Sequence, residues 1–366
     1  MGSSRFLVVN GVPCLTQDTP SISTFLQSHS GIPRSLNHPS PISSGAYTTS
    51  RTNFNASSLL FWERHLLRLA DSTRVLAESC PDLFISQRTR TTLLSSSSSS
   101  CWDFVLRPLV TDSLRAGFRS VLIEQQDGGR SDGEELAVTT LICGNGGPPM
   151  GLDVYVHFGI YVPPVFGGTE NSAHLAVVGC GRDVARAKWS EWVRTRKCLE
   201  KLRPPLATEL LLSNDGDRIL EGSITNFFVV CHREMDSATG DPYDCKSRHS
   251  FEVQTAPISD GILPGVVRQL VIEICSSKGI PFREVAPSWS SRKSWKEAFI
   301  TNSLRLVQHV ETILVPNSWK HLQSKMWNEV SWEEKKFEGP GLITTEIQKQ
   351  IMERAGIEGY PLSHFL

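Results

Sequence analysis

RILEGSITNFFVV, residues 218–230, places a carboxylate, a hydroxyl and an amide (Glu221, Ser223 and Asn226) just before four apolar residues. The period-two alternation of a strand would put Glu221 and Ser223 on one side, and Gly222 would permit a bulge or a close approach. Glutamate is almost never buried unless it is paired. The stretch therefore allows two interpretations of Glu221: a solvated carboxylate on an edge strand, or a buried one that faces a cation.

The composition is that of an ordinary soluble globular protein. The chain has 366 residues, enough for two domains, and 39% of them are hydrophobic and 20% charged. Its 37 basic and 38 acidic residues give a formal net charge of −1 and are dispersed along the chain. This balance argues against a nucleic-acid partner and against electrostatic attraction to a membrane.

The cysteines and the N-terminus indicate a reducing compartment. The nine cysteines form no CxxC pair, so we expect core thiols rather than a disulfide framework, and we expect no metal site. No stretch approaches the ~18 uninterrupted apolar residues of a membrane span. FLVVNG, residues 6–11, is typical of a strand and a turn, which leaves little room for a cleaved targeting segment. We therefore predict a cytoplasmic protein.

The first part of the chain predicts a small α/β domain with a Ser/Pro-rich insertion. Residues 27–45 have the turn formers of a long loop, and the serine run at 95–100 is typical of a flexible linker. Residues 61–84 predict an amphipathic helix closed by Pro81. Period-two patterns then predict three strands: FRSVLIEQQ (118–126), ELAVTTLICG (135–144) and LDVYVHFGIYVPP (152–164).

The Pro/Gly-rich segment 163–172 predicts the domain boundary, which gives a small domain over 1–165 and a larger domain over 166–366. The larger domain is expected to contain strands at 173–180, 206–218, 219–230 and 297–302 and a helix after Pro264. A C-terminal helix follows, for which Thr345 and Gln348 could form a capping box.

Three further segments carry side chains suited to an anionic or aldehyde ligand. In ILPGVVRQ a turn leads into a helix, whose free N–H groups at residues 265–267 could bind phosphate. In ERHLLRL, His65 and Arg68 can project from one side of a helix, and Arg68 could clamp a phosphate. Lys188, if desolvated, could form a Schiff base with an aldehyde cofactor. Taken alone, such features are more commonly an empty helix start, a solvated arginine and a surface lysine.

The order of these features resembles that of the class IV, or fold type IV, pyridoxal-phosphate (PLP) aminotransferases. HLLRL, Lys188, LEGSITNFF, ILPGVVRQ and FITNSLRLVQHV follow one another as in that family, and the resemblance runs from about Phe6 to the C-terminal GPGLITTEIQKQIMERAG. The E-x-S-x-x-N-x-F and L-P-G-x-x-R elements are specific in combination. The resemblance implies an α+β, two-domain fold with a small N-terminal α/β domain and a larger, β-barrel-like domain with helices.

The resemblance also implies a role for each matching residue. Lys188 would form the aldimine with pyridoxal 5′-phosphate, Arg68 would hold the phosphate, and Glu221 would contact the pyridine nitrogen. A carboxylate there favours the protonated ring, which is the better electron sink, and a released Lys188 would move the proton at the substrate Cα. Further cofactor contacts are expected from Ser223, Asn226, Gly265, Val266, Val267, Ser303 and Leu304, and a substrate pocket from Tyr47, Tyr155, His157 and Tyr161.

Two departures from the family pattern leave the substrate open. Val267 stands where many members have a threonine, so a hydroxyl contact to phosphate is lost. VYVHFGIYVPP lacks the arginine that D-amino-acid transaminases carry there for the substrate carboxylate, and Arg51, on the strand of Tyr47, indicates no side-chain preference. Acidic, branched-chain and D-amino donors are all compatible with the sequence.

We expect a D-amino-acid aminotransferase-like transferase that moves an amino group between an amino acid and a 2-oxo acid. Its cofactor would lie between the two domains, and the protein would be a homodimer, as the resemblance implies. A lyase of the aminodeoxychorismate lyase type and a PLP-binding protein without turnover are the alternatives. A further possibility is that the motifs are coincidental in an α+β protein with another role.

Overall fold

The computed structural model describes residues 5–14, 19, 21–27, 44–84, 99–128, 133–145, 151–232 and 250–366. Most of the predicted loop at 27–45 and of the serine linker at 95–100 lies outside these residues. The chain forms two compact units. Unit 1 comprises Met1–Pro163, Arg186–Thr195 and Ala355–Leu366, and unit 2 comprises Pro164–Ala185 and Arg196–Arg354. The segment 186–195, which the sequence assigned to the second domain, thus lies in unit 1.

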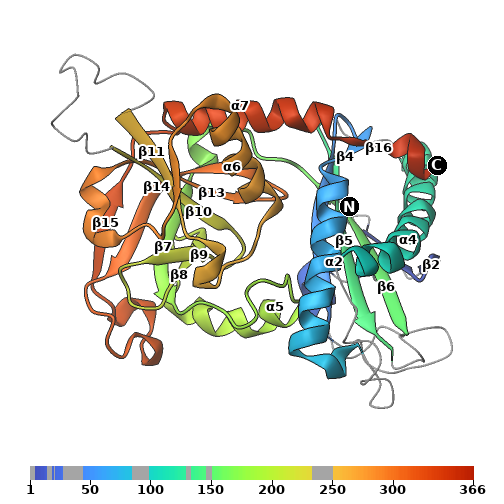
Figure 1. Ribbon diagram of the computed structural model, residues 1–366, viewed down its shortest axis with the longest axis horizontal. Coiled ribbons are helices and arrows are strands. Elements are labelled where there is room, and N and C mark those ends of the chain that lie inside the picture. The colour runs from blue at the N-terminus through green and yellow to red at the C-terminus, as the bar shows by residue number, and fades with distance from the viewer. Residues whose placement is uncertain are drawn as a thin grey trace. The chain divides into compact units, whose positions relative to one another are not determined.

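Unit 1 is built on a seven-stranded antiparallel sheet in the order β16-β4-β3-β5-β6-β1-β2 (Figure 1). The turn between the first two strands has positive φ at Asn10 and Gly11, as a two-residue hairpin turn requires, so the predicted strand and turn are confirmed. The strands are β1 (Arg5–Val9), β2 (Val12–Cys14), β3 (Ala46–Asn53), β4 (Ser58–Leu59), β5 (Glu135–Gly144), β6 (Leu152–Tyr161) and β16 (Tyr360–Pro361).

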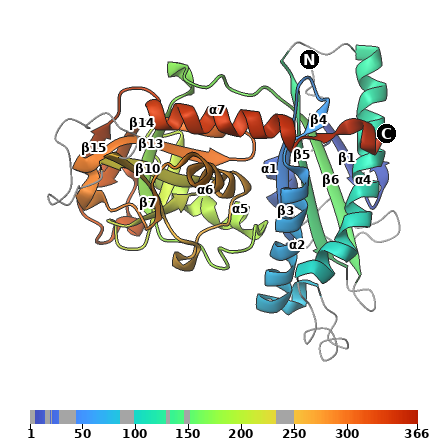
Figure 2. The same ribbon diagram turned by 45° about the horizontal axis from the view of Figure 1, so that its top comes forward.

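Two long helices, α2 (Trp62–Ser79) and α4 (Ser99–Gly128), pack against each other and against this sheet (Figure 2). Phe118 of α4 meets Phe158 of β6 with ring centroids 5.1 Å apart. A Cβ on Gly117 would lie 2.2 Å from the Phe158 ring, so glycine is what allows this close approach of helix and sheet.

Two short helices pack against the opposite face of the sheet. These are α1 (Ile22–Gln27) and α5 (Glu191–Thr195), which contact each other. Phe25 of α1 and Val193 of α5 share one apolar cluster with Tyr155 of β6, whose side chain points away from that of Phe158 because strand residues alternate.

The predicted strand at 118–126 is wrong, because these residues form the last part of α4. A nine-residue window with β-branched Val121 and Ile123 suggested a strand, but it shows too little of the helical period to reveal it. Over the whole helix the buried side chains recur every four residues, which is a helical spacing: Trp102, Leu106, Val110, Leu114 and Phe118. Ser99 and Ser100, the end of the predicted linker, begin this helix.

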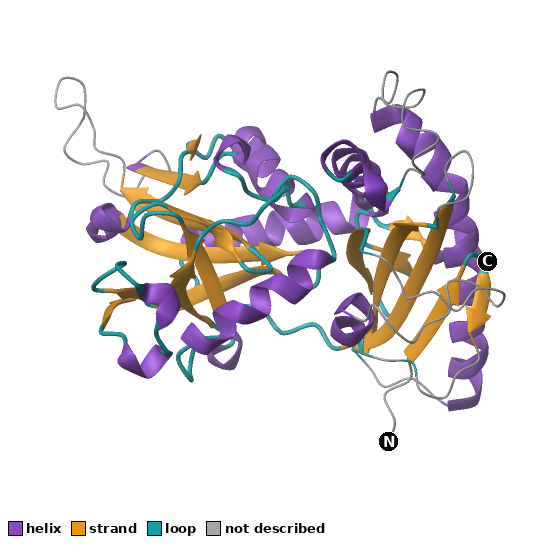
Figure 3. Cartoon of the chain, turned by 90° about the horizontal axis from the view of Figure 1, so that it is seen from below, coloured by secondary structure: helices purple, strands orange, loops and turns teal. Residues whose placement is uncertain are grey.

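Unit 2 contains a closed, mixed six-stranded barrel (Figure 3). The strands follow one another as β10-β13-β14-β7-β8-β9, and β9 pairs with β10 to close the barrel. Only the β14–β7 and β7–β8 pairs among these are parallel. The strands are β7 (Ala173–Gly179), β8 (Glu209–Ser213), β9 (Ile219–Gly222), β10 (Asn226–His232), β13 (Trp295–Asn302) and β14 (Leu306–Pro316). The predicted α+β class and barrel-like second domain are confirmed.

Further elements extend the barrel. Strands β11 (Phe251–Thr255) and β12 (Phe282–Glu284) continue the sheet from β10, and β15 (Trp332–Lys336) pairs with β14. The remaining helices are α6 (Val266–Lys278) and α7 (Leu342–Ile357). In the described part of the chain, no helix is long and apolar enough to cross a membrane.

The stretch 219–230 is a hairpin of two strands and not the single strand that its alternation predicted. The Gly222 N–H donates to the Thr225 carbonyl oxygen at 2.9 Å, and Glu221 pairs with Asn226. A Cβ on Gly222 would lie 2.0 Å from Thr225 Oγ1, so the turn depends on glycine. Ser223 therefore lies in the turn and does not share a strand face with Glu221.

The predicted capping box of the C-terminal helix is also wrong, because α7 begins at Leu342, ahead of Thr345. The carboxylate of Glu297 on β13 accepts hydrogen bonds from the Ile343 N–H (3.1 Å) and the Thr344 N–H (2.8 Å). A cap supplied from a distant strand satisfies the same free donors and leaves no local sequence signal.

Candidate functional site

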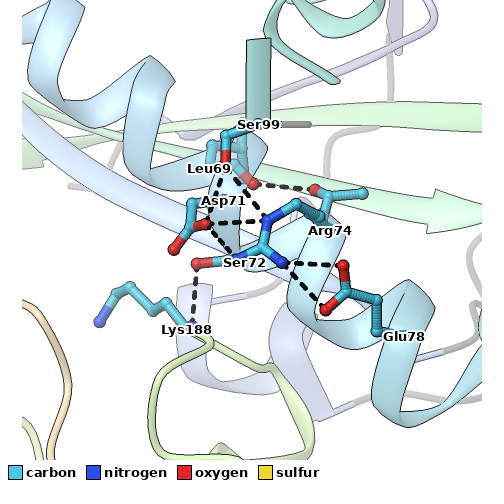
Figure 4. A network of polar contacts seen from close by, with 8 residues as sticks. Leu69, Asp71, Ser72, Arg74, Glu78, Ser99 and Lys188 are labelled. Carbon is cyan, nitrogen blue, oxygen red and sulfur yellow. Dashed lines mark hydrogen bonds and ion pairs between the residues drawn. The ribbon is translucent and has the colours of Figure 1, made fainter. Parts of the chain in front are cut away.

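In unit 1, the backbone of Lys188 is held by two hydrogen bonds. Its N–H donates to Ser72 Oγ on α2 at 3.1 Å (Figure 4). Its carbonyl oxygen accepts the N–H of Tyr47 on β3 at 2.9 Å. The neighbouring pair Ala46 and Trp189 forms an isolated antiparallel bridge, so the segment of Lys188 runs alongside the start of β3.

An ionic network, also drawn in Figure 4, stabilises the part of α2 that contains Ser72, the acceptor of the Lys188 N–H. The Arg74 guanidinium donates to Asp71 at 2.7 Å and to Glu78 at 2.8 Å. Arg74 Nε also donates to Ser99 Oγ at 3.1 Å, which joins α2 to the first residue of α4. Ser72, which lies between the two acidic partners in sequence, is fully buried, so its hydroxyl is a fixed acceptor.

The side chain of Lys188 lies over an aromatic ring. Its Nζ is 4.6 Å from the ring centroid of Tyr47, within the range of a cation–π contact. Lys188 is half-buried, whereas Lys197 and Lys201 are exposed. Of these three lysines, Lys188 is thus the one that is partly buried and whose amine lies over an aromatic ring.

A second polar group in unit 1 joins Thr48, His65 and Arg68. Arg68 Nη2 donates to Thr48 Oγ1 at 2.7 Å, and Thr48 Oγ1 lies 2.9 Å from His65 Nδ1. Arg68 Nη2 also lies 3.4 Å from His65 Nδ1, and because a guanidinium can only donate, this contact favours Nδ1 as an acceptor that takes the Thr48 proton. The network therefore assigns the neutral histidine with its proton on Nε2.

Electrostatics favour the same neutral form. Burial, together with the positive charges of Arg68 and Lys188, holds the pKa of His65 well below its ordinary value. Both cations oppose protonation of His65, and Arg68 Nη2 lies 3.4 Å from His65 Nδ1. Two cations near a neutral imidazole suit an anion.

The four predicted pocket residues do not form one open group. Tyr47 lies beside Lys188, but Tyr155 and His157 are buried against Phe25 of α1, with ring centroids 6.1 and 5.9 Å from it. Tyr161 lies further along β6, where it pairs with Glu135 of β5. The sequence did not predict α1, so the cover it provides for Tyr155 and His157 was not expected.

Arg51 forms hydrogen bonds within its own strand, β3. Its Nη1 donates to the Thr52 carbonyl oxygen at 3.0 Å and to Asn53 Oδ1 at 3.1 Å. Burial lowers its pKa, and the charges of Tyr161 and Glu135 oppose that effect. The arginine therefore supports the end of β3, a few residues away from Tyr47.

In unit 2, Glu221 is buried and paired, so the second interpretation of the opening stretch is the one that the structure shows. Arg182 Nε donates to Glu221 Oε1 at 2.9 Å, and the side chains are 7% and 2% exposed. The other carboxylate oxygen accepts the Leu263 N–H at 3.0 Å. Arg182 has no local motif that would have identified it, because its partner belongs to a different strand.

Asn226 connects Glu221 to the start of α6. Its Nδ2 donates to the Leu263 carbonyl oxygen at 2.9 Å and lies 3.4 Å from Glu221 Oε2. A Cβ on Gly265 would lie 2.1 Å from Asn226 Oδ1, so the turn before α6 requires glycine at this point. Gly265 is the N-cap of α6 and makes no side-chain cap, which leaves the first N–H groups of the helix for another acceptor.

Ser223 has a structural partner that the sequence did not predict. Its Oγ donates to Glu209 Oε1 at 2.7 Å, and its N–H lies 3.0 Å from the same oxygen. Burial raises the pKa of Glu209, while the hydrogen bond from Ser223 opposes the rise. Ser223 and Glu209 thus fix the β9–β10 turn that carries Glu221.

The other residues predicted to contact a phosphate lie in two places, the first turn of α6 and the turn between β13 and β14. Val266 and Val267 are buried in the first turn of α6. The Leu304 N–H, beside the half-buried Ser303, donates to Asn302 Oδ1 at 3.1 Å. A ligand at the β13–β14 turn would therefore compete with Asn302 for this donor. Within the described ranges, no group of three or more His, Cys, Asp or Glu could hold a metal ion.

Comparison with known proteins places this arrangement in a family. Residues 201–313 match the family model for amino-transferase class IV. No curated protein sequence matches the chain. Over residues 201–313 the chain matches the class IV aminotransferase family.

Solved structures show the fold of this chain. A branched-chain aminotransferase from Thermoproteus uzoniensis with norvaline has 16% identity and a TM-score of 0.58, with 99% of this chain and 100% of that chain covered. A fold IV transaminase from Curtobacterium pusillum has 12% identity and a TM-score of 0.57, with 95% and 99% covered. A PLP-bound hypothetical aminotransferase from Mycobacterium tuberculosis has 14% identity and a TM-score of 0.56, with 96% and 99% covered. At these identities the likeness establishes fold type IV.

The family match includes some of the predicted site residues and not others. Glu221, Gly265 and Leu304 lie within residues 201–313, whereas Arg68 and Lys188 precede them. The roles of all five in this chain stay predictions, and the contacts described above are what supports them.

The ion pair of Glu221 predicts a measurable coupling. Arg182→Met leaves a buried carboxylate without its ionic partner, and we expect the free energy of unfolding to fall by about 3–5 kcal/mol. Adding Glu221→Gln removes the unpaired charge and should restore more than half of the loss. Denaturant unfolding of the single and double variants measures this, with Arg115→Met, which breaks an exposed pair with Asp112, as the control. Equal stability of the single and double variants would show that the pair is not coupled.

The neutral His65 predicts a pH dependence. The unfolded chain takes up a proton at the ordinary value of 6.5, and the folded chain does so only at lower pH. Above pH 6.5 both states carry neutral His65, and its contribution to the free energy of unfolding is at its maximum. Below pH 6.5 the free energy of unfolding falls by up to about 1.4 kcal/mol per pH unit, until the pKa of the folded state is reached. His65→Asn should reduce this slope in urea titrations at pH 7.5, 6.5 and 5.5, whereas the exposed-site control His321→Asn should not. A slope that His65→Asn leaves unchanged would contradict the neutral assignment.

Proposed function

We propose that this protein is a PLP-dependent aminotransferase that moves an amino group between an amino acid and a 2-oxo acid. The observation that carries the proposal is the placement of Lys188. Its backbone is fixed by Ser72 and Tyr47, its amine is half-buried, and its charge acts on His65 together with that of Arg68. A lysine and an arginine whose charges act on the same histidine suit a ligand with both an aldehyde and a phosphate.

The donor sets of the two units fit pyridoxal phosphate. Unit 1 supplies an amine for the aldehyde and a guanidinium for the phosphate, through Lys188 and Arg68. Unit 2 supplies the uncapped N-terminus of α6, which favours an anion, and the carboxylate of Glu221, which favours a protonated ring nitrogen. Val267 contributes a backbone donor without the hydroxyl that many family members add.

When bound, the cofactor supplies an aldehyde and an electron sink for the substrate carbanion. The chain's own residues supply the rest. Lys188 Nζ takes the proton from the substrate Cα and returns it, as a general base and then an acid. Glu221 would stabilise positive charge at the ring nitrogen, and its existing partner Arg182 would moderate the negative potential that the ring meets.

Arg68 is positioned for its role by neighbours that cannot compete with it for the phosphate. Thr48 orients the guanidinium through the 2.7 Å hydrogen bond, and neutral His65 adds no charge that would repel it. The donor substrate stays open, since β6 offers no arginine for a carboxylate. The homodimer and the cytoplasmic location also stay predictions.

Transaminase activity tests the proposal. Purified protein with pyridoxal phosphate is given a panel of L- and D-amino acids and a 2-oxo acid, and the new amino acid and oxo acid are quantified by chromatography. We expect turnover with at least one donor, and a loss on the order of 10²–10⁴-fold in Lys188→Ala, because general acid–base catalysis is worth that much. Lys197→Ala, at an exposed lysine, is the matched control and should keep full turnover.

Two outcomes would contradict the transaminase proposal. Pyruvate release from aminodeoxychorismate without an amino acceptor would identify a lyase that uses the same lysine. Full turnover in Lys188→Ala would show that another group carries the chemistry.

A further inference from the structure

We propose that Tyr47 is a positioning residue for Lys188, and that its ring face, not its hydroxyl, holds the lysine amine as an ammonium until a ligand arrives. The inference rests on the proposed function for its biological meaning. Its physical content concerns two residues of unit 1 and holds without a cofactor.

The pair is built into the backbone. The Tyr47 N–H donates to the Lys188 carbonyl oxygen at 2.9 Å, and Ser190 N–H donates to the Gly45 carbonyl oxygen at 2.9 Å. The Gly45 N–H returns a hydrogen bond to Ser190 Oγ at 3.0 Å. Ring and amine therefore come from residues whose backbones are fixed against each other on both sides.

The ring is a rigid surface. Tyr47 is 7% exposed and belongs to the apolar cluster that includes Leu141, Tyr155 and Phe25. A tyrosine packed in this way cannot turn its edge toward the lysine without disturbing the cluster. The Nζ of Lys188 lies 4.6 Å from the centroid, where the negative face of the ring attracts a cation.

The surrounding charges explain why such a contact is useful. Lys188 and Arg68 both oppose protonation of His65, and Arg68 Nη2 lies 3.4 Å from His65 Nδ1, so the amine has a second cation near it. A carboxylate at this point would attract the ammonium but would also repel an anionic ligand. An aromatic face attracts the ammonium without adding a negative charge, and so keeps the volume suited to an anion.

Holding the ammonium has a consequence for reactivity. An amine attacks an aldehyde only in its neutral form, and the ring stabilises the charged form. Tyr47 therefore fixes the position of Lys188 and also makes it less reactive toward electrophiles in solution than a lysine of the same exposure without the ring. Loss of the ring should raise the fraction of neutral amine near pH 8 and, with it, the observed reactivity of this lysine.

Competitive labelling of the cofactor-free protein with trace isotopic acetic anhydride, followed by peptide mapping, measures this directly. Lys197 in the same digest is the internal reference. In Tyr47→Leu we expect Lys188 to label about threefold faster at pH 8, with its labelling profile moved to lower pH by about half a unit, the size of a partly desolvated cation–π contact. Tyr47→Phe retains the ring and should match the unaltered protein.

Two results would overturn the proposal: a Tyr47→Leu profile identical to that of the unaltered protein, or a Tyr47→Phe profile that matches Tyr47→Leu, which would assign the effect to the hydroxyl. Thermal unfolding and Lys197 labelling report whether each variant is folded, and Tyr47→Met, unbranched and without a π face, replaces leucine if that variant does not fold. The labelling uses no turnover. A protein that shows the expected labelling but no transamination would contradict the proposed function alone.

Discussion

The hydrogen bond between the Tyr47 N–H and the Lys188 carbonyl oxygen is the contact on which the candidate site of unit 1 depends. It joins segments far apart in the chain and returns residues 186–195 to the sheet of the N-terminal region. The Ser72 hydroxyl secures the other side of the same residue. Once this backbone is fixed, the lysine amine meets the Tyr47 ring, and its charge reaches the volume of Arg68 and His65.

Unit 2 solves a different physical problem, which is the burial of a carboxylate in a closed barrel. Glu221 tolerates burial because Arg182 neutralises it and the Leu263 N–H completes its hydrogen bonding. The β9–β10 turn, held by Ser223 and Glu209, places it at the end of the hairpin. Each unit thus holds its candidate donor groups in place through contacts within the unit.

Local sequence patterns were sufficient to predict much of the fold and several residues of the candidate site. FLVVNG predicted the first strand and its turn, and the order of Lys188, Glu221 and the LPG turn indicated the family. Patterns failed where the partner is remote in sequence: Arg182 for Glu221, Glu209 for Ser223 and Glu297 for α7 lie on other elements. Periodicity also misled in two places. The window 118–126 was too short to show the helical period of α4, and the alternation across 219–230 continued through a glycine turn, so a hairpin looked like one strand.

The central claim is that Lys188 is the residue that meets the cofactor aldehyde. Incubation with pyridoxal phosphate, reduction with borohydride and peptide mapping by mass spectrometry test it most directly. The account predicts one reduced adduct, on Lys188, with the absorbance of the bound aldehyde lost on reduction. An adduct spread over exposed lysines such as Lys197, or one that persists unchanged in Lys188→Arg, would contradict it.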